Sequence, residues 1–206
     1  MIKADGHIFV LETAHTTYCF WRMETGHLEH LYYGRHLTLP EHPAERDVAP
    51  LMEKHTFAPG NTNLCDGEHP AFSLEDMRLE MSSYGKGDIR EPFVEIVHAD
   101  GSTTSDFRYE NYEITEKTAE TENGDLPGEA QRLCIRLRDH SYDLVLELHY
   151  DVYAECDAIV RSAVLFNESK EMIRLNRLMS TQIDFDPAEY VFTTFTGAWA
   201  REMHRS

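Results

Sequence analysis

The sequence predicts an all-β protein, a sandwich or barrel built from many short antiparallel strands. The clearest evidence lies between residues 133 and 151, where apolar and polar side chains alternate along two runs that flank Asp139-His140-Ser141. This period of two is typical of strands with one buried face. Turn-forming residues recur along the chain at roughly the 8–12-residue spacing of β-sandwiches, and strong helix signals are few.

Each further strand is read from β-branched and aromatic residues between turn signals. Near the N-terminus, strands are expected at 8–11, 17–23 and 28–33, with Thr25-Gly26 as the hairpin turn between the last two. In the strand at 107–114 the aromatic alternation slips in phase between Tyr109 and Tyr112. The remaining strands are expected at 93–98, 159–167, 172–183 and 190–196.

Two segments interrupt this pattern. Residues 40–70 are rich in proline, glycine, histidine and acids and read as a long ordered loop, and residues 119–130 form a polar surface excursion. A short helix is expected at 74–81, because Ser73 can cap it and Asp76 lies in its first turn.

Composition limits the partners. The 206 residues are 41% hydrophobic, enough for a core, and carry a net charge of −18. Nucleic acids and anionic membranes require clustered Lys and Arg, so both are disfavoured, whereas neutral sugars are compatible. No signal peptide or apolar run long enough to span a membrane is found. The four cysteines form no CxxC motif, so free thiols and a cytoplasmic location are expected.

The segment Gly85-Lys86-Gly87-Asp88-Ile89-Arg90-Glu91-Pro92 predicts an ordered turn at a loop–strand junction. Its glycines permit a tight turn, and Pro92 holds Glu91 extended. Asp88 and Arg90, two positions apart, would face the same way and bond to each other or to the backbone. Glu80 precedes this turn and is a candidate to pair with Arg90 or with a residue of another domain.

Three sets of residues suggest chemistry of their own. His27 and His30 form an HxxH pattern, but residues three apart on a strand face opposite sides, so no metal site is expected. Asp184 and Asp186 share a face at about 7 Å, within the range for a glycosidase pair, although the end of a strand before Pro187 explains them better. Glu147 and His149 share a strand face and would be the acid and base of an epimerase.

A series of motifs in a fixed order carries a resemblance to a known family. The motifs are Thr17-Tyr18, Gly26-His27-Leu28, Leu31-Tyr32-Tyr33-Gly34, Phe72-Ser73-Leu74-Glu75-Asp76 with Glu80, the turn at 85–92, Asp100-Gly101-Ser102, Asp106-Phe107, Leu126-Pro127-Gly128, Ile159-Val160-Arg161-Ser162, Asn167 and Gly197-Ala198-Trp199-Ala200-Arg201-Glu202. Together they resemble the N-terminal domain of the microbial α-galactosidases of glycoside hydrolase family 36.

The resemblance implies a large two-sheet antiparallel β-sandwich, a supersandwich like that of galactose mutarotases. It implies one domain over residues 1–206, the N-terminal part of a longer retaining enzyme that releases terminal galactose from melibiose or raffinose. The two catalytic aspartates would lie on a (β/α)8 barrel that follows, so this chain alone would be inactive. No cofactor or metal is implied. The expected partners are that barrel, further copies in a tetramer, and α-galactosides.

The resemblance also implies roles for single residues. The loop at 50–72 would shape a neighbouring subunit's sugar pocket, with Glu53 binding sugar hydroxyls, although Glu53-Lys54 stands one residue further from Phe57 than is usual in the family. Trp199 would lie in an exposed apolar patch that meets the barrel. Two alternatives remain open: a stand-alone carbohydrate-binding module, and a single-domain epimerase that uses His149 and Glu147.

Overall fold

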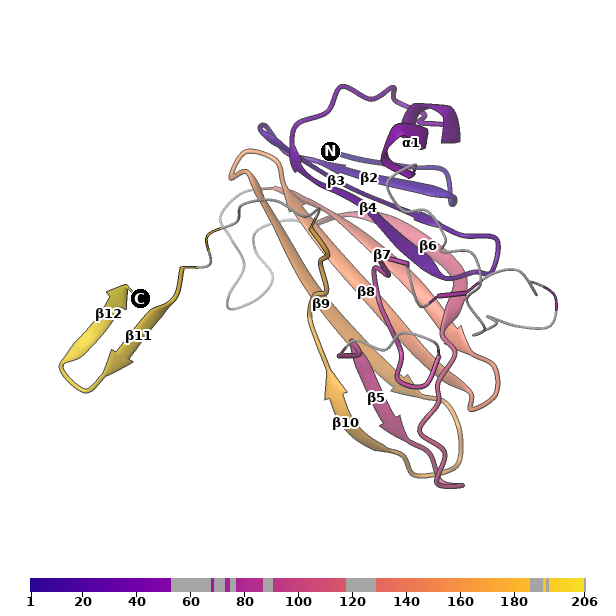
Figure 1. Ribbon diagram of the computed structural model, residues 1–206. Coiled ribbons are helices and arrows are strands. Elements are labelled where there is room, and N and C mark those ends of the chain that lie inside the picture. The colour runs from indigo at the N-terminus through magenta and orange to yellow at the C-terminus, as the bar shows by residue number, and fades with distance from the viewer. Residues whose placement is uncertain are drawn as a thin grey trace.

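The computed structural model describes residues 1–52, 68, 73–74, 77–86, 91–117, 129–185, 191 and 193–205. Two four-stranded antiparallel sheets dominate it (Figure 1). The first contains β1 (Ile2–Ala4), β2 (Ile8–Glu12), β3 (Thr16–Arg22) and β4 (Leu28–Arg35). The second contains β6 (Arg108–Lys117), β7 (Ala130–Asp139), β8 (Leu144–Tyr153) and β9 (Ala158–Asn167). Two small sheets pair β5 (Val94–Val97) with β10 (Arg174–Leu178), and β11 (Phe195–Ala198) with β12 (Arg201–Arg205).

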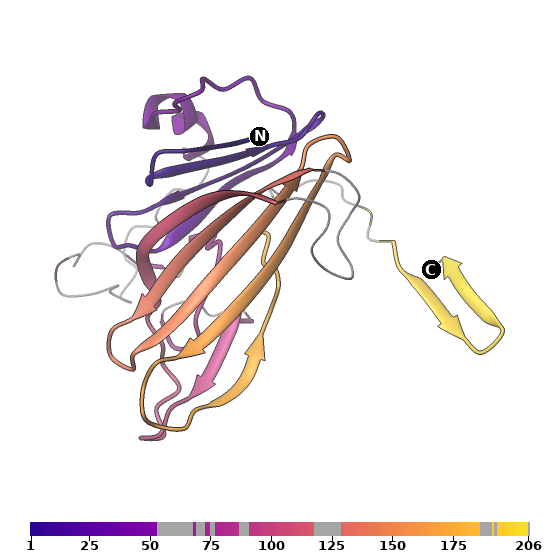
Figure 2. The same cartoon turned by 180° about the vertical axis from the view of Figure 1, so that it is seen from behind.

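The core lies between the two large sheets, which confirms the predicted all-β sandwich. From the first sheet it takes Phe9, Leu11, Tyr18 and Phe20; from β7 and β8 it takes every second residue, as the alternation predicted. The phase slip predicted between Tyr109 and Tyr112 is a register shift between Tyr109 and Asn111, where β6 pairs with β7. The β11–β12 hairpin projects away from the sandwich (Figures 1 and 2).

The helix is not where the sequence predicted it. The described residues 77–81 form no helix, because their backbone groups bond to β4: the Glu80 amide donates to the Leu28 carbonyl at 2.9 Å, and the His30 amide donates to the Arg78 carbonyl at 2.7 Å. The prediction at 74–81 was wrong because sheet pairing outweighed a weak local cap.

The single helix among the described residues, α1 (Glu45–Met52), lies inside the predicted long loop. The Asp47 carboxylate accepts a hydrogen bond from the Ala44 amide at 2.8 Å, as in a capping box. The buried Val48 side chain packs the helix onto the outer face of the first sheet, against Ile8, Val10 and their neighbours. At eight residues it is far too short to cross a membrane, and no other described segment forms a membrane-spanning helix.

Two glycines in turns have left-handed backbone conformations, but only one of them is sterically crowded. Gly85 and Gly101 have φ angles of +80° and +85°. A Cβ atom at Gly85 would lie 2.4 Å from Thr104 Oγ1, whereas a Cβ at Gly101 would meet nothing within 4 Å. We expect Gly101→Ala to lower the free energy of unfolding by about 1–2 kcal/mol, the cost of the left-handed conformation alone.

Gly85→Ala should lower the free energy of unfolding by more than Gly101→Ala, since the methyl group also displaces Thr104. Urea denaturation of both variants measures the difference. Equal losses would show that the loop around Thr104 adjusts without cost, contrary to this prediction.

Candidate functional site

A buried ionic network links the two large sheets. Its centre is Glu80, whose side chain is fully buried. From the first sheet, the Tyr18 hydroxyl lies 2.7 Å from each carboxylate oxygen. From the second, the Tyr150 hydroxyl donates to Oε1 at 2.7 Å, and the Arg161 guanidinium on β9 contacts the same oxygen at 2.8 Å. His30 Nδ1 lies 3.2 Å from Oε2.

Arg161 extends this network to the segment after β10. Its guanidinium donates to Thr181 Oγ1 at 2.8 Å and to the Gln182 carbonyl at 3.3 Å. It also lies over the Tyr150 ring, 4.9 Å from the centroid. One arginine therefore joins the edge strand β9, both sheets through Glu80, and the segment that leads toward the C-terminal hairpin.

The electrostatics of the network keep Glu80 and Arg161 charged. Burial by itself opposes ionisation of Glu80, but the Arg161 cation and the hydrogen bond with His30 outweigh it and lower the pKa of Glu80. Burial and the negative charge of Glu80 raise the pKa of Tyr18 and of Tyr150, so both phenols remain protonated donors. With four donors around it, the Glu80 carboxylate has little acceptor capacity left to activate a water molecule.

The pKa of Glu80 has a consequence for stability at low pH. Because the folded state lowers this pKa below its usual value of 4.5, the ionised carboxylate contributes stability above that pH and loses the contribution as pH falls through the folded-state pKa. We expect the free energy of unfolding to fall on acidification below about pH 4.5, and less steeply in Glu80→Gln. Chemical denaturation at several pH values measures both slopes; identical slopes would show that Glu80 does not take part.

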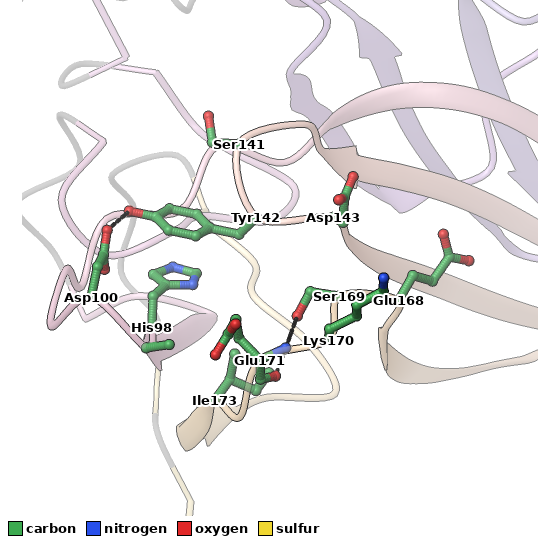
Figure 3. Close-up of a pocket in the computed structure, with 11 residues that line it drawn as sticks. His98, Asp100, Ser141, Tyr142, Asp143, Glu168, Ser169, Lys170, Glu171 and Ile173 are labelled. Atoms are coloured by element: carbon green, nitrogen blue, oxygen red, sulfur yellow. Dashed lines mark hydrogen bonds between the residues drawn. The ribbon is translucent and has the colours of Figure 1, made fainter.

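Among the described residues, one cavity borders this network, and a larger one is lined by none of its members. Arg161 lines a cavity of about 310 Å³ together with Tyr18, Tyr33, Ile159, Ser180, Thr181 and Ile183. A larger cavity of about 450 Å³ lies between the β7–β8 turn and the segment that joins β9 to β10 (Figure 3).

At one end of the larger cavity, His98 stacks on Tyr142 with ring centroids 3.5 Å apart. The Tyr142 hydroxyl donates to Asp100 Oδ2 at 3.1 Å. Hydroxyl, imidazole and carboxylate groups of this kind can bind a polar ligand. Sequence reasoning missed this pocket; its only signal was the Asp100-Gly101 turn.

The structure describes only some of the predicted site residues. Glu53, Asp88, Arg90 and Asp186 lie outside the described residues. The partner that the structure gives Glu80 is Arg161, distant in sequence.

The two histidines of the HxxH pattern have separate partners, since His27 contacts Asp106 at 2.8 Å and His30 contacts Glu80.

Two other predicted features lie on the surface. Trp199 lies in the β11–β12 turn and is 97% exposed, while its place in an interface patch stays a prediction. His149 Nε2 lies 3.1 Å from Glu147 Oε2, so this pair does converge. It lies on the outward face of the second sheet, and Glu147 is also held by Arg136 at 3.0 Å.

Comparisons with known proteins agree with the fold. The family model for the glycosyl hydrolase family 36 N-terminal domain matches residues 26–206. Alpha-galactosidase AgaA of Geobacillus stearothermophilus is 32% identical over 94% of this chain, which spans 26% of that protein. The crystal structure of an α-galactosidase from Lactobacillus brevis superposes with a TM-score of 0.83 at 31% identity, covering 97% of this chain and 26% of that one.

A variant of AgaA solved in complex with raffinose gives a TM-score of 0.81 at 28% identity, over 97% of this chain and 27% of that chain. This chain thus spans about a quarter of the length of the relatives it matches. The family match extends over most of the sequence, and the sandwich superposes on solved members. The chain therefore belongs to glycosyl hydrolase family 36, in which it corresponds to the N-terminal domain.

Proposed function

We propose that this chain is the non-catalytic N-terminal domain of an α-galactosidase that hydrolyses terminal α-D-galactosides such as melibiose and raffinose with retention of configuration. The observation that carries the proposal is the match of residues 26–206 to the family's N-terminal domain, together with an alignment that covers 26% of a whole α-galactosidase. In this proposal residues 1–206 are one domain, and the nucleophile and acid/base carboxylates belong to a (β/α)8 barrel.

The C-terminal hairpin supports the proposal that the chain packs on a catalytic domain. Large apolar side chains on and just before the hairpin are exposed: Val191 by 84%, Phe195 by 60%, Trp199 by 97% and Met203 by 76%. Several large apolar side chains left exposed within one short segment are typical of an interface. We assign it to the catalytic domain of the same enzyme, with Trp199 as the main anchor.

Further parts of the proposal concern assembly and the sugar pocket. We propose that the enzyme is a cytoplasmic homotetramer and that Glu53, in the loop at 50–72, contacts galactoside hydroxyls in a neighbouring subunit's site. Asp88 and Arg90 are assigned to an ordered turn at the domain edge. The net charge of −18 is compatible with a neutral sugar as substrate.

A stand-alone carbohydrate-binding role is the second candidate, and the cavity of about 450 Å³ favours it. That volume falls within the range of small-molecule sites. The epimerase alternative is weaker, because Glu147 and His149 lie on an open sheet face and Glu147 is already bonded to Arg136.

The two candidates are separated by assaying the 206-residue chain for hydrolysis of a chromogenic α-galactoside and, in parallel, titrating it with raffinose by calorimetry. We expect no turnover and no binding by the isolated chain. Turnover would contradict the non-catalytic role. Binding that is lost in Tyr142→Ala but kept in Tyr33→Ala would favour the carbohydrate-binding module.

A further inference from the structure

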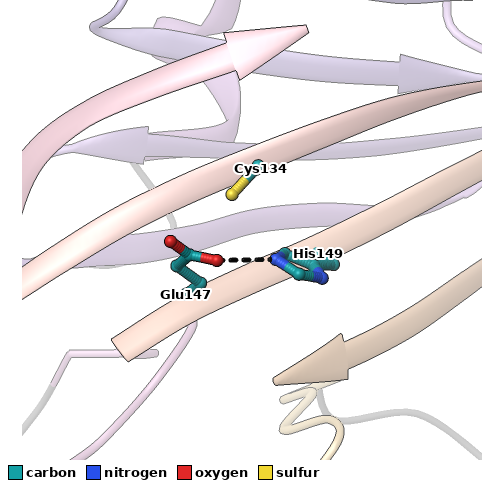
Figure 4. A group of neighbouring side chains, drawn as sticks. All are labelled: Cys134, Glu147 and His149. Atoms are coloured by element: carbon teal, nitrogen blue, oxygen red, sulfur yellow. Dashed lines mark hydrogen bonds and ion pairs between the residues drawn. The ribbon is translucent and has the colours of Figure 1, made fainter. Parts of the chain in front are cut away.

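Three metal-binding side chains converge on the outward face of the second sheet (Figure 4). Cys134 on β7 is paired directly with His149 on β8, and Glu147 precedes His149 by two residues on the same strand face. One donor atom from each, namely the Cys134 sulfur, a Glu147 carboxylate oxygen and a His149 ring nitrogen, lies within 4.8 Å of the other two. Sheet register alone thus brings a thiol, a carboxyl and an imidazole to one point.

We propose that Cys134, Glu147 and His149 form a binding site for Zn²⁺. The types of donor atom indicate which metal would bind. Zinc binds thiolate sulfur, imidazole nitrogen and carboxylate oxygen, whereas Ca²⁺ and Mg²⁺ prefer oxygen ligands alone. Zinc bonds of about 2.0–2.3 Å place tetrahedral ligand atoms about 3.3–3.8 Å apart. The Glu147 oxygen and the His149 nitrogen are already 3.1 Å apart, so small side-chain rotations complete the site.

The surroundings of Glu147 suit a metal ligand. Its two oxygens have different partners: Oε1 accepts a hydrogen bond from Arg136 at 3.0 Å, and Oε2 faces His149. Arg136 is itself fixed by Glu110 and by Glu168, each at 2.9 Å. Metal-binding carboxylates commonly have such an outer partner that orients them, and here it leaves one oxygen for the ion.

Access also fits a zinc ion. The three side chains are half-buried on a sheet face, so an ion can reach them from solvent without unfolding the sheet. Burial raises the pKa of the Cys134 thiol to about 11 and Arg136 already pairs with Glu147, so zinc must displace the thiol proton as it binds. Three protein ligands leave a fourth position for water, as in zinc sites that exchange ligands. This site is independent of galactoside hydrolysis, so the two proposals can fail separately.

The test is a titration of the 206-residue chain with Co²⁺, which replaces zinc and reports its ligands by absorbance. We expect one equivalent to give visible d–d bands and a near-ultraviolet thiolate-to-cobalt band, and one equivalent of Zn²⁺ to remove both. Cys134→Ser should abolish the thiolate band, and Glu147→Gln and His149→Ala should each weaken binding at least about 10-fold, the range of even outer-shell changes.

Matched controls are Cys156→Ser, at an exposed thiol, and His140→Ala, at an exposed turn histidine. Both should bind Co²⁺ like the parent chain. Circular dichroism of every metal-free variant establishes that the sheet is intact, and His149→Ala provides a second variant if Cys134→Ser misfolds. A thiolate band that survives Cys134→Ser, one that disappears in Cys156→Ser, or the lack of a stoichiometric band in the parent chain would overturn the proposal.

Discussion

Replacing Arg161 with Ala should lower the free energy of unfolding by about 3–5 kcal/mol, the usual cost of removing one partner from a buried ion pair. The reason is that Glu80, fully buried, would keep its two tyrosine donors and its contact with His30 but lose the arginine that pairs with it at 2.8 Å. Urea denaturation followed by tryptophan fluorescence measures the loss.

Two controls make the Arg161 result specific. Arg177→Ala removes an arginine whose partner, Glu91, is 78% exposed, and should cost less than about 1 kcal/mol. The double variant with Arg161→Ala and Glu80→Gln should recover part of the loss, since no uncompensated charge remains. A loss for Arg161→Ala no larger than that for Arg177→Ala would show that the network does not tie the sheets together.

Replacing Phe20 with Ala should cost about 3–5 kcal/mol in the free energy of unfolding. Phe20 is fully buried and lies between the two sheets, with its ring centroid 5.0 Å from that of Phe9 and 5.2 Å from that of Tyr150. Truncation therefore removes both aromatic contacts and leaves a cavity in a core that cannot collapse freely.

The matched control is Phe166→Ala on the outward face of β9, where the side chain is 41% exposed. It should change the free energy of unfolding by no more than about 0.5 kcal/mol. Comparable losses at the two positions would mean that the outward face of β9 is covered in solution. This result would contradict the placement of the core between the two large sheets alone.

The strands could be predicted because their evidence is local. Alternation along 133–151 identifies β7 and β8 with the correct buried face, and Gly26, with a φ of +83°, forms the predicted turn before β4. Short elements were missed or misplaced. β1 has only three residues, and α1 lies in a segment whose proline and acids resemble a loop.

The sites could be predicted less well, because they depend on register and on long-range pairing. Glu80 was singled out, but its partner Arg161 lies on an edge strand far along the chain, and nothing local connects the two. Glu147 and His149 were paired correctly by strand period. Their neighbour Cys134 becomes visible only when the register of β7 on β8 is known.

The most direct test of the central claim is a chimera in which residues 1–206 replace the N-terminal domain of Geobacillus stearothermophilus AgaA. We expect the chimera to hydrolyse a chromogenic α-galactoside, the AgaA catalytic part alone to be inactive or unstable, and Trp199→Asp to abolish the gain while Tyr84→Asp, at another exposed aromatic residue, does not. A catalytic part that is fully active alone, or a well-folded chimera that has no activity, would contradict the assignment of this chain as a supporting N-terminal domain.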